Sequence, residues 1–301
     1  MARKVRKAGA GDWIAGARLR TLPLSIAPVI LGTAIAHEEQ ATWEWLNIGL
    51  ALAVAVFLQI GVNYANDYSD GVRGTDKFRL GPSRLTGSGA AKPRTVLVVA
   101  LVFFGLAALA GVALVILVGQ YWLLAVGAVS IVAAYFYTGG KRPYGYYGLG
   151  ELFVFVFFGL VATVGTAYVQ LKVLFGAGPW PDALIAGASI GFIACAVLMV
   201  NNIRDLPQDK LAGKRTLAVL IGNMAARIVF TVFLLLPFVI LIYFVLLYPN
   251  ATYTYFALFL ALPAVLITLT AKTPKELVLA LQLTSFTALV YAVGLGWALA
   301  F

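Results

Sequence analysis

The sequence predicts an all-α integral membrane protein, and three observations support this fold class. Of the 301 residues, 62% are hydrophobic and only 11% are charged, against roughly 25% charged in a typical soluble domain. Apolar runs recur at about the length of a helix that crosses a bilayer. The positive charges are distributed according to those runs. A soluble chain of this length could not bury so much apolar surface in one core, and disorder is excluded for the same reason.

Nine apolar runs are long enough to be membrane-spanning helices. They do not alternate with period two, which excludes barrel strands, and the prolines inside several of them are tolerated in membrane helices. We treat the chain 1–301 as a single transmembrane domain that begins with a basic segment, 1–20. The expected spans are about 22–37, 45–65, 95–118, 121–138, 151–171, 183–203, 223–248, 252–271 and 279–300.

Positive charge lies almost entirely on one side of these spans. Of the 22 lysines and arginines, all but Lys172 precede the first span or lie around the connections between spans 2 and 3, 4 and 5, 6 and 7, and 8 and 9. Because positively charged connections stay in the cytoplasm, we expect a cell-membrane protein with a cytoplasmic N-terminus and a C-terminus at the opposite face. Topology thus accounts for the net charge of +10, and we expect no nucleic-acid partner.

Carboxylates gather in two clusters, although the chain has only twelve acidic residues. NYANDYSDGVRGTD follows the second span, and NNIRDLPQD follows the sixth. Both span ends are cytoplasmic in the predicted topology. Residues three and four apart on a helix share a face, and in the second cluster this requires the helix to continue past Pro207. The residues that share a face are Asn63, Asp67 and Asp70, with Asn66 beside them, and Asn201, Asp205 and Asp209.

The matching positions of the two clusters suggest an internal repeat. Each cluster follows the second span of a group of four, so spans 1–4 and 5–8 would be two four-helix repeats of the same orientation, with a ninth helix added. The connections at the cytoplasmic end would form a cap of loops over the clusters.

The clusters have the chemistry of a magnesium site. Carboxylates on one face repel one another and are costly near a membrane, and a cation relieves both effects. All-oxygen ligands suit Mg²⁺ or Ca²⁺ rather than zinc or copper, and two ions could flank a diphosphate. Helix caps at solvated helix ends are the alternative explanation. The predicted metal ligands are Asn63, Asp67, Asp70, Asp205 and Asp209.

Basic residues follow each cluster. The connection after the first cluster is rich in glycine, which lets backbone N–H groups approach an anion closely. The connection after the second carries Lys210, Lys214 and Arg215. These cations could bind a diphosphate, or they could only set the topology and contact anionic lipid. Glu151, at the start of the fifth span, could cap its helix or meet the substrate.

Several motifs resemble those of a known family. The sequences N-D-x-x-D at Asn66–Asp70 and D-x-x-x-D at Asp205–Asp209 resemble the two aspartate-rich motifs of the UbiA-type intramembrane aromatic prenyltransferases. N-x-x-x-D at Asn63–Asp67 and Y-x-x-x-K at Tyr137–Lys141 match further elements of that superfamily. The runs 17–32, 62–76 and 141–168 are similar to its menaquinone branch. Gly74 departs from the pattern by replacing a third aspartate, and Asp76 comes two residues later.

The resemblance implies an activity. Members of the superfamily have nine transmembrane helices and use Mg²⁺ with a polyprenyl diphosphate. The menaquinone branch transfers the prenyl group to 1,4-dihydroxy-2-naphthoate with loss of CO₂ and diphosphate, giving demethylmenaquinol. The prenyl tail would lie among membrane lipids. On this basis we expect catalytic residues at Asp67, Asp70, Asp205, Asp209 and Lys141, and substrate-binding residues at Arg20, Asn63, Asn66, Asn201, Tyr137, Arg142 and Lys214.

Three other functions stay open at this point. Another aromatic acceptor, such as hydroxybenzoate, haem or chlorophyllide, would use the same motifs. A CDP-alcohol phosphotransferase shares D-x-x-D-G, found here at Asp67–Gly71, but its motif does not continue in this sequence. A cation transporter would place its acids near the middle of a span, whereas both clusters lie at span ends.

Overall fold

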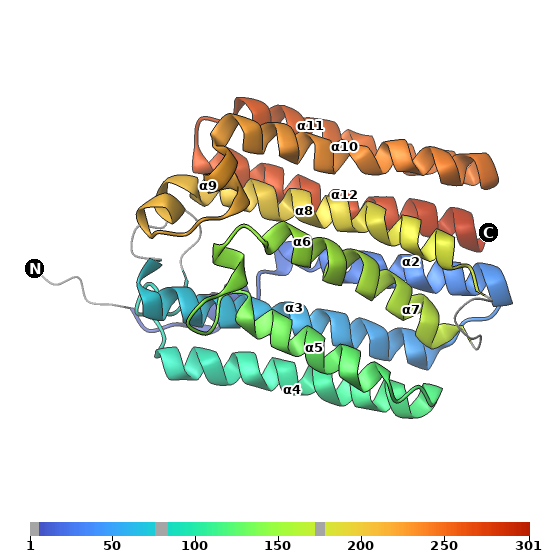
Figure 1. Cartoon of the computed structure of the whole chain (residues 1–301), viewed down its shortest axis with the longest axis horizontal. Helices are drawn as coiled ribbons and strands as arrows, with labels where there is room; N and C mark the ends of the chain where they lie inside the picture. The colour runs from blue at the N-terminus through green and yellow to red at the C-terminus, as the bar shows by residue number, and fades with distance from the viewer. Residues whose placement is uncertain (1–5, 76–83, 172–177) are drawn as a thin grey trace, which may run out of the picture.

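The computed structural model describes residues 6–75, 84–171 and 178–301, and its regular elements in these ranges are all helical. The elements run side by side along the long axis of the molecule (Figure 1). In chain order they are α1 (Ala10–Gly16), η1 (Leu19–Thr21), α2 (Pro23–Gln40), α3 (Trp45–Arg73), α4 (Pro93–Val118), α5 (Leu123–Phe136), η3 (Tyr144–Tyr146), α6 (Gly150–Val154), the π-helix η4 (Phe155–Val161), α7 (Ala162–Gln170), α8 (Trp180–Leu211), α9 (Leu217–Ile221), α10 (Asn223–Leu247), η5 (Pro249–Ala257), α11 (Leu258–Thr270) and α12 (Pro274–Ala300).

The described helices make this a multi-pass membrane protein. Seven of them are long and apolar enough to cross a bilayer, and the pair Ala10–Thr21 and Pro23–Gln40, bent by 46°, would be an eighth. The expected span at 121–138 corresponds to α5, which has 14 residues. At 1.5 Å per residue α5 is about 21 Å long, shorter than a hydrocarbon core of about 30 Å. The count of nine spans, the repeat and the single domain therefore stay predictions.

The two helices that carry the acidic clusters extend beyond the expected spans. α3 continues past residue 65 to Arg73, and α8 continues through Pro207 to Leu211. A prediction from apolar runs ends a helix where its lipid-facing residues end. α3 and α8 continue further because their polar residues are buried against other parts of the protein. Both clusters thus lie on helices, and Pro207 does not break the second one.

Helix packing brings the ends of α3 and α8 to the same end of the molecule. α3 packs against α4, α2 packs against α12 and α7, and α8 packs against α10, α12 and η4. The largest core cluster lies among α2, α8, α10 and α12 and contains Phe230, Leu234 and Tyr291. α9 and the connections that follow α3 and α8 lie at one end, and the C-terminus lies at the other (Figure 1).

Glycines set the closest helix contacts. A Cβ at Gly32 in α2 would lie 2.4 Å from the carbonyl oxygen of Thr163 in α7, and one at Gly159 in η4 would lie 2.5 Å from the carbonyl oxygen of Gly187 in α8. Small residues of this kind let membrane helices pack backbone to backbone. The wall formed by α6, η4 and α7 is held against α2 and α8 in this way.

We expect Gly32→Ala to lower the free energy of unfolding by about 1–3 kcal/mol, because the new methyl group overpacks the contact with α7. Gly105→Ala is the matched control. A Cβ added at Gly105 would have no neighbouring atom within 4 Å, so this change should leave the free energy of unfolding unchanged or raise it by up to about 1 kcal/mol. Thermal midpoints of both variants in one detergent check this. Equal midpoints would contradict the close packing of α2 on α7.

Candidate active site

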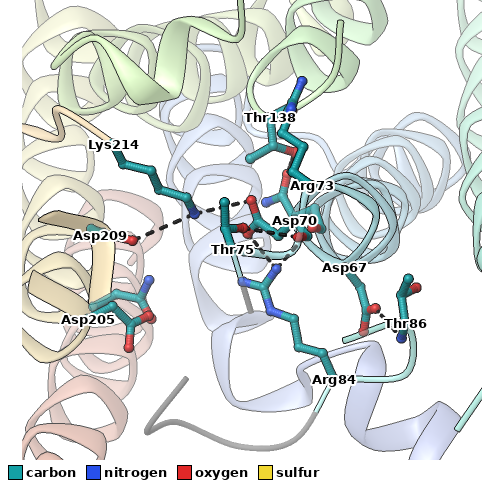
Figure 2. A network of polar contacts seen from close by, with 12 residues as sticks. Asp67, Asp70, Arg73, Thr75, Arg84, Thr86, Thr138, Asp205, Asp209 and Lys214 are labelled. Atoms are coloured by element: carbon teal, nitrogen blue, oxygen red, sulfur yellow. Dashed lines mark hydrogen bonds and ion pairs between the residues drawn. The ribbon is translucent and has the colours of Figure 1, made fainter. Parts of the chain in front are cut away.

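Two carboxylates, one from each cluster, meet across a lysine. Lys214, in the connection between α8 and α9, places Nζ 3.1 Å from Oδ1 of Asp70 and 3.6 Å from Oδ1 of Asp209. Figure 2 shows this ammonium between the two helix ends. The predicted residues Asp70, Asp209 and Lys214 therefore form one cluster, although α3 and α8 are far apart in sequence.

Asp70 has further partners from two other connections. Arg84 Nη1 lies 2.6 Å from Oδ2 of Asp70, and the hydroxyl of Tyr146 donates to Oδ1. The guanidinium of Arg73 and the ammonium of Lys214 lie 5.2 and 4.6 Å from the centre of the Tyr146 ring, within the range of a cation–π contact. The Asp70 residue is only 2% exposed, so its charge is compensated by these partners rather than by bulk water.

The carboxylates determine the protonation of their neighbours. Burial disfavours the Lys214 ammonium, but Asp70 and Asp209 outweigh burial and raise its pKa above the usual value. Burial, together with Asp70, raises the pKa of the Tyr146 hydroxyl. Lys214 is therefore a cation and Tyr146 a hydrogen-bond donor at neutral pH and well above it.

The other predicted acid of α8 belongs to a separate pair. Asp205 accepts two hydrogen bonds from Arg204, 2.8 Å from Nε and 2.6 Å from Nη2. Arg204 Nη2 also donates to Oδ1 of Asn201 at 2.7 Å. The predicted residue Arg20, in η1, lies near enough to Arg204 and Asp205 for their charges to act on it, and its role stays a prediction.

An apolar cavity of about 530 Å³ opens beside these charges. Its walls come from α2, α3, α4 and α5 and from the segment α6–α8. At the charged end, Asn63 donates to the carbonyl oxygen of Ala17 at 2.9 Å, and Oδ1 of Asn66 accepts from the hydroxyl of Thr138 at 2.6 Å. The cavity thus changes from polar to apolar along its length. Its polar lining residues include Arg18, Asn63, Asn66, Asn201, Tyr137 and Tyr144.

Asp67 lies apart from the acids that contact Lys214. Its Oδ2 accepts the backbone N–H of Leu85 and its Oδ1 that of Thr86, both at 2.8 Å. In Figure 2 it points toward Thr86, and Asp70 points toward Lys214. Metal ligation by Asp67 stays a prediction.

The other predicted residues differ in exposure and in their surroundings. Lys141 and Arg142 are exposed, so their roles also stay predictions. Tyr137 lines the cavity. Glu151 is buried and its Oε1 accepts from Asn202 at 3.0 Å. Asp76, the aspartate outside the expected pattern, falls beyond the described residues.

Sequence reasoning did not single out Arg84, Tyr146, Arg204 or Arg18 as site residues. Arg84 stood among six cations of a glycine-rich connection, and Arg204 stood between two predicted residues, so both had a weak signal. Arg18 lines the cavity from a left-handed conformation, with φ of 54°, which is uncommon for a non-glycine residue. Tyr146 falls within the run 141–168 that resembles the menaquinone branch, but no pattern separated it from its neighbours, because its position depends on how the connection after α5 folds.

The donor set fits a magnesium ion that is shared with a phosphate. Among the residues that the structure describes, no three His, Cys, Asp or Glu side chains group closely enough to hold a metal alone. Mg²⁺ commonly binds one or two carboxylates and completes its shell with water and substrate phosphate oxygens. Asp70 and Asp209, with nearby asparagine amides, provide oxygen donors of that kind.

The chain belongs to the UbiA prenyltransferase family, which it matches over residues 25–290. It is 46% identical over 291 residues to the 1,4-dihydroxy-2-naphthoate octaprenyltransferase of Mycobacterium tuberculosis, a match that covers 96% of this chain and 97% of the relative. It is 40% identical to the protein of the same name from Escherichia coli, over 71% of this chain and 70% of the relative.

Solved structures of low sequence identity share the fold. A UbiA homologue from Aeropyrum pernix superposes with a TM-score of 0.69 at 16% identity, covering 91% of this chain and 96% of that one. A UbiA homologue from Archaeoglobus fulgidus, bound to GPP and Mg²⁺, superposes with a TM-score of 0.62 at 14% identity, covering 96% of this chain and 99% of that one. These neighbours confirm the all-helical fold expected from the sequence.

We expect Lys214→Ala to lower the free energy of unfolding by on the order of 2 kcal/mol, because it leaves Asp70 and Asp209 facing each other without the charge between them. Lys141→Ala is the matched control, since this lysine is exposed and its removal should cost less than about 0.5 kcal/mol. Thermal unfolding of both variants without ligand measures the difference. If Lys214→Ala lowered the thermal midpoint no more than Lys141→Ala does, Lys214 would not stabilise the cluster.

Proposed function

We propose that this protein transfers a polyprenyl group from a polyprenyl diphosphate to 1,4-dihydroxy-2-naphthoate, releasing diphosphate and CO₂ and giving demethylmenaquinol. The family and the names of its relatives support this reaction. One structural observation carries it: the buried carboxylates and cations at the ends of α3 and α8 adjoin asparagines, Asn66 and Asn201, that line a large apolar cavity. A diphosphate with a long hydrocarbon tail has those two chemistries in one molecule.

The charged end would bind the diphosphate. Lys214 and Arg84 supply cations there, and Asp70 and Asp209, with Asp205 beyond them, supply oxygen donors for Mg²⁺. Bound Mg²⁺ would stabilise negative charge on the diphosphate as it leaves. Lys214 and Arg84 act in the same direction, because positive charge fixed where negative charge develops lowers the barrier. The Archaeoglobus fulgidus homologue, which shares the fold, is bound to both GPP and Mg²⁺, and this supports the assignment.

The cavity would hold the prenyl chain. Its wall includes Phe153, Phe157 and Phe158 from α6 and η4 and small residues from α4 and α5. Those aromatic faces, and that of Tyr137, are suited to stabilise a carbon that gains positive charge as its bond to the diphosphate oxygen breaks. α5 contributes no buried residue of its own. A tail longer than the cavity would leave the protein beside α5 and continue into lipid.

The acceptor would lie where the polar and apolar parts of the cavity meet. Asn63, Asn66 and Asn201 offer amide groups to its hydroxyls, and Arg18 offers a cation for its carboxylate. The ring carbon that bears the carboxylate forms the new bond to the prenyl carbon. The electron pair of the bond to the departing CO₂ then restores the aromatic ring, so no proton has to leave that carbon.

We further propose that this end faces the cytoplasm, as the distribution of lysine and arginine implies. Ser88→Cys, exposed in the connection before α4, should react with a membrane-impermeant maleimide only after the membrane is opened. Asn250→Cys, exposed at the opposite end, is the control and should react in intact cells. The native Cys195 is 2% exposed and should contribute little background. Labelling of Ser88→Cys but not of Asn250→Cys in intact cells would contradict the proposed topology.

The reaction itself is tested by incubating purified protein with Mg²⁺, a prenyl diphosphate and 1,4-dihydroxy-2-naphthoate, followed by mass analysis. We expect a prenylated naphthoquinol that lacks the carboxylate, and no product after chelation of the metal. A product that keeps its carboxylate, or prenylation of hydroxybenzoate in preference, would contradict the proposed acceptor chemistry.

In the same assay Asp70→Asn and Asp209→Asn should each lower kcat/KM by roughly a hundredfold or more, because each removes a charge that holds Mg²⁺ and diphosphate. Asp182→Asn is the matched control at the far end of α8. There an amide oxygen can still accept from the hydroxyl of Tyr243, so turnover should change less than about twofold. Near-normal turnover of both site variants would refute the role of the cluster.

A further inference from the structure

Asp67 is hydrogen-bonded to the backbone of the connection before α4. Both of its carboxylate oxygens accept backbone N–H groups, from the consecutive residues Leu85 and Thr86, at 2.8 Å each. Asp67 is 3% exposed and Leu85 is equally buried. Hydrogen bonds to an ionised acceptor are about twice as strong as neutral ones. Asp67 therefore ties the start of the described α3–α4 connection to the side of α3.

Packing holds the same segment, 84–91, in the same place. The Leu85 side chain belongs to a hydrophobic cluster with Ile60, Tyr64 and Phe104. Thr86 lies so close to α3 that a Cβ at Gly71 would come within 2.4 Å of its methyl group. The segment thus follows the surface of α3 closely, and the contact with Asp67 is its polar component.

This arrangement puts Arg84 into the active site. Arg84 directly precedes the two residues that Asp67 holds. Its Nη1 lies 2.9 Å from the carbonyl oxygen of Asn66 and 2.6 Å from Oδ2 of Asp70, and its side chain is only 8% exposed. Figure 2 shows Thr86 against Asp67, while Arg84, two residues earlier in the same connection, reaches Asp70.

We propose that Asp67 is a positioning residue that holds the 84–91 segment so that Arg84 meets the diphosphate, and that it is not a ligand of the metal. The proposal deepens the proposed function and rests on it for the identity of the substrate. It also divides the first acidic cluster between two tasks. Asp70 faces the substrate, whereas Asp67 holds in place the segment that forms one wall of the site.

The two roles predict different responses to Asp67→Asn. An asparagine keeps one acceptor oxygen but presents an NH₂ group to the other backbone N–H, so one of the two hydrogen bonds is lost and two donors face each other. The segment should loosen and Arg84 should leave its place. A metal ligand would instead lose affinity for Mg²⁺ while the segment stayed in place.

Hydrogen exchange and kinetics on the full-length protein separate these outcomes. In Asp67→Asn, the amides of Leu85 and Thr86 should exchange faster. The KM for prenyl diphosphate should rise roughly tenfold, while the half-saturating Mg²⁺ concentration at saturating donor stays within about twofold. Asp70→Asn should keep the protection of Leu85 and Thr86, because it leaves both bonds to Asp67 intact.

Two further variants connect the effect to Arg84. Gly71→Ala pushes the segment away from α3 without changing a carboxylate, and it should reproduce the faster exchange and the higher KM. In an Arg84→Gln background, Asp67→Asn should raise KM by less than about twofold more, because the residue through which it acts is already gone. Full additivity of the two changes would contradict the proposal.

A rise of roughly tenfold or more in half-saturating Mg²⁺ for Asp67→Asn, with unchanged exchange in 84–91, would overturn the proposal and return Asp67 to the metal site. The exchange measurement needs no turnover. Failure of this inference is therefore distinguishable from failure of the proposed function, which would appear as absence of product with the wild-type protein.

Discussion

Compensation of the buried charge of Asp70 is the constraint on which the active end of this protein depends. An isolated carboxylate would be far too costly to bury beside a bilayer. Asp70 is stabilised by Lys214 and Arg84, and Lys214 in turn reaches Asp209. Since these residues come from the ends of α3 and α8 and from the connections that follow them, satisfying one charge requires two parts of the chain that are far apart in sequence to meet.

The meeting of the α3 and α8 ends across Lys214 also creates the sharp change of polarity that the proposed reaction needs. A site for a prenyl diphosphate must be strongly charged at one end and apolar a few ångströms away. The asparagines of α3 and α8 line the cavity at this boundary and are polar without adding charge. The glycine contacts of α2 and η4 keep the opposite wall close. Stability and function therefore draw on one arrangement, in which helix packing sets the distance between fixed charges.

Much of this could be predicted from the sequence, because bilayer thickness and charge asymmetry constrain each helix separately. The apolar runs correspond to helices, and the site residues of α3 and α8 lie at one end, as the two clusters predicted. The family motifs also led to the family confirmed by the relatives. The short helix α5, the extension of α3 to Arg73 and the short helices α1 and α9 were beyond such reasoning. The extension of α3 depends on protein contacts rather than on lipid, and an apolar run does not determine where a short helix begins and ends.

The residues that prediction missed share a physical reason. Arg84 and Tyr146 lie on connections, and the direction of a connection depends on what it docks against, which no local pattern contains. Asp67 and Asp70 show the limit on a helix as well. A separation of three residues, at about 100° per residue, turns through about 300° and so leaves the two side chains about 60° apart around the helix. Both therefore fall on one face in a sequence motif. The docking of Leu85 and Thr86 on one side and of Lys214 on the other separates them. A spacing rule can therefore find the helix face of a site, but the assignment of each carboxylate to substrate or to scaffold follows from where the connections pack.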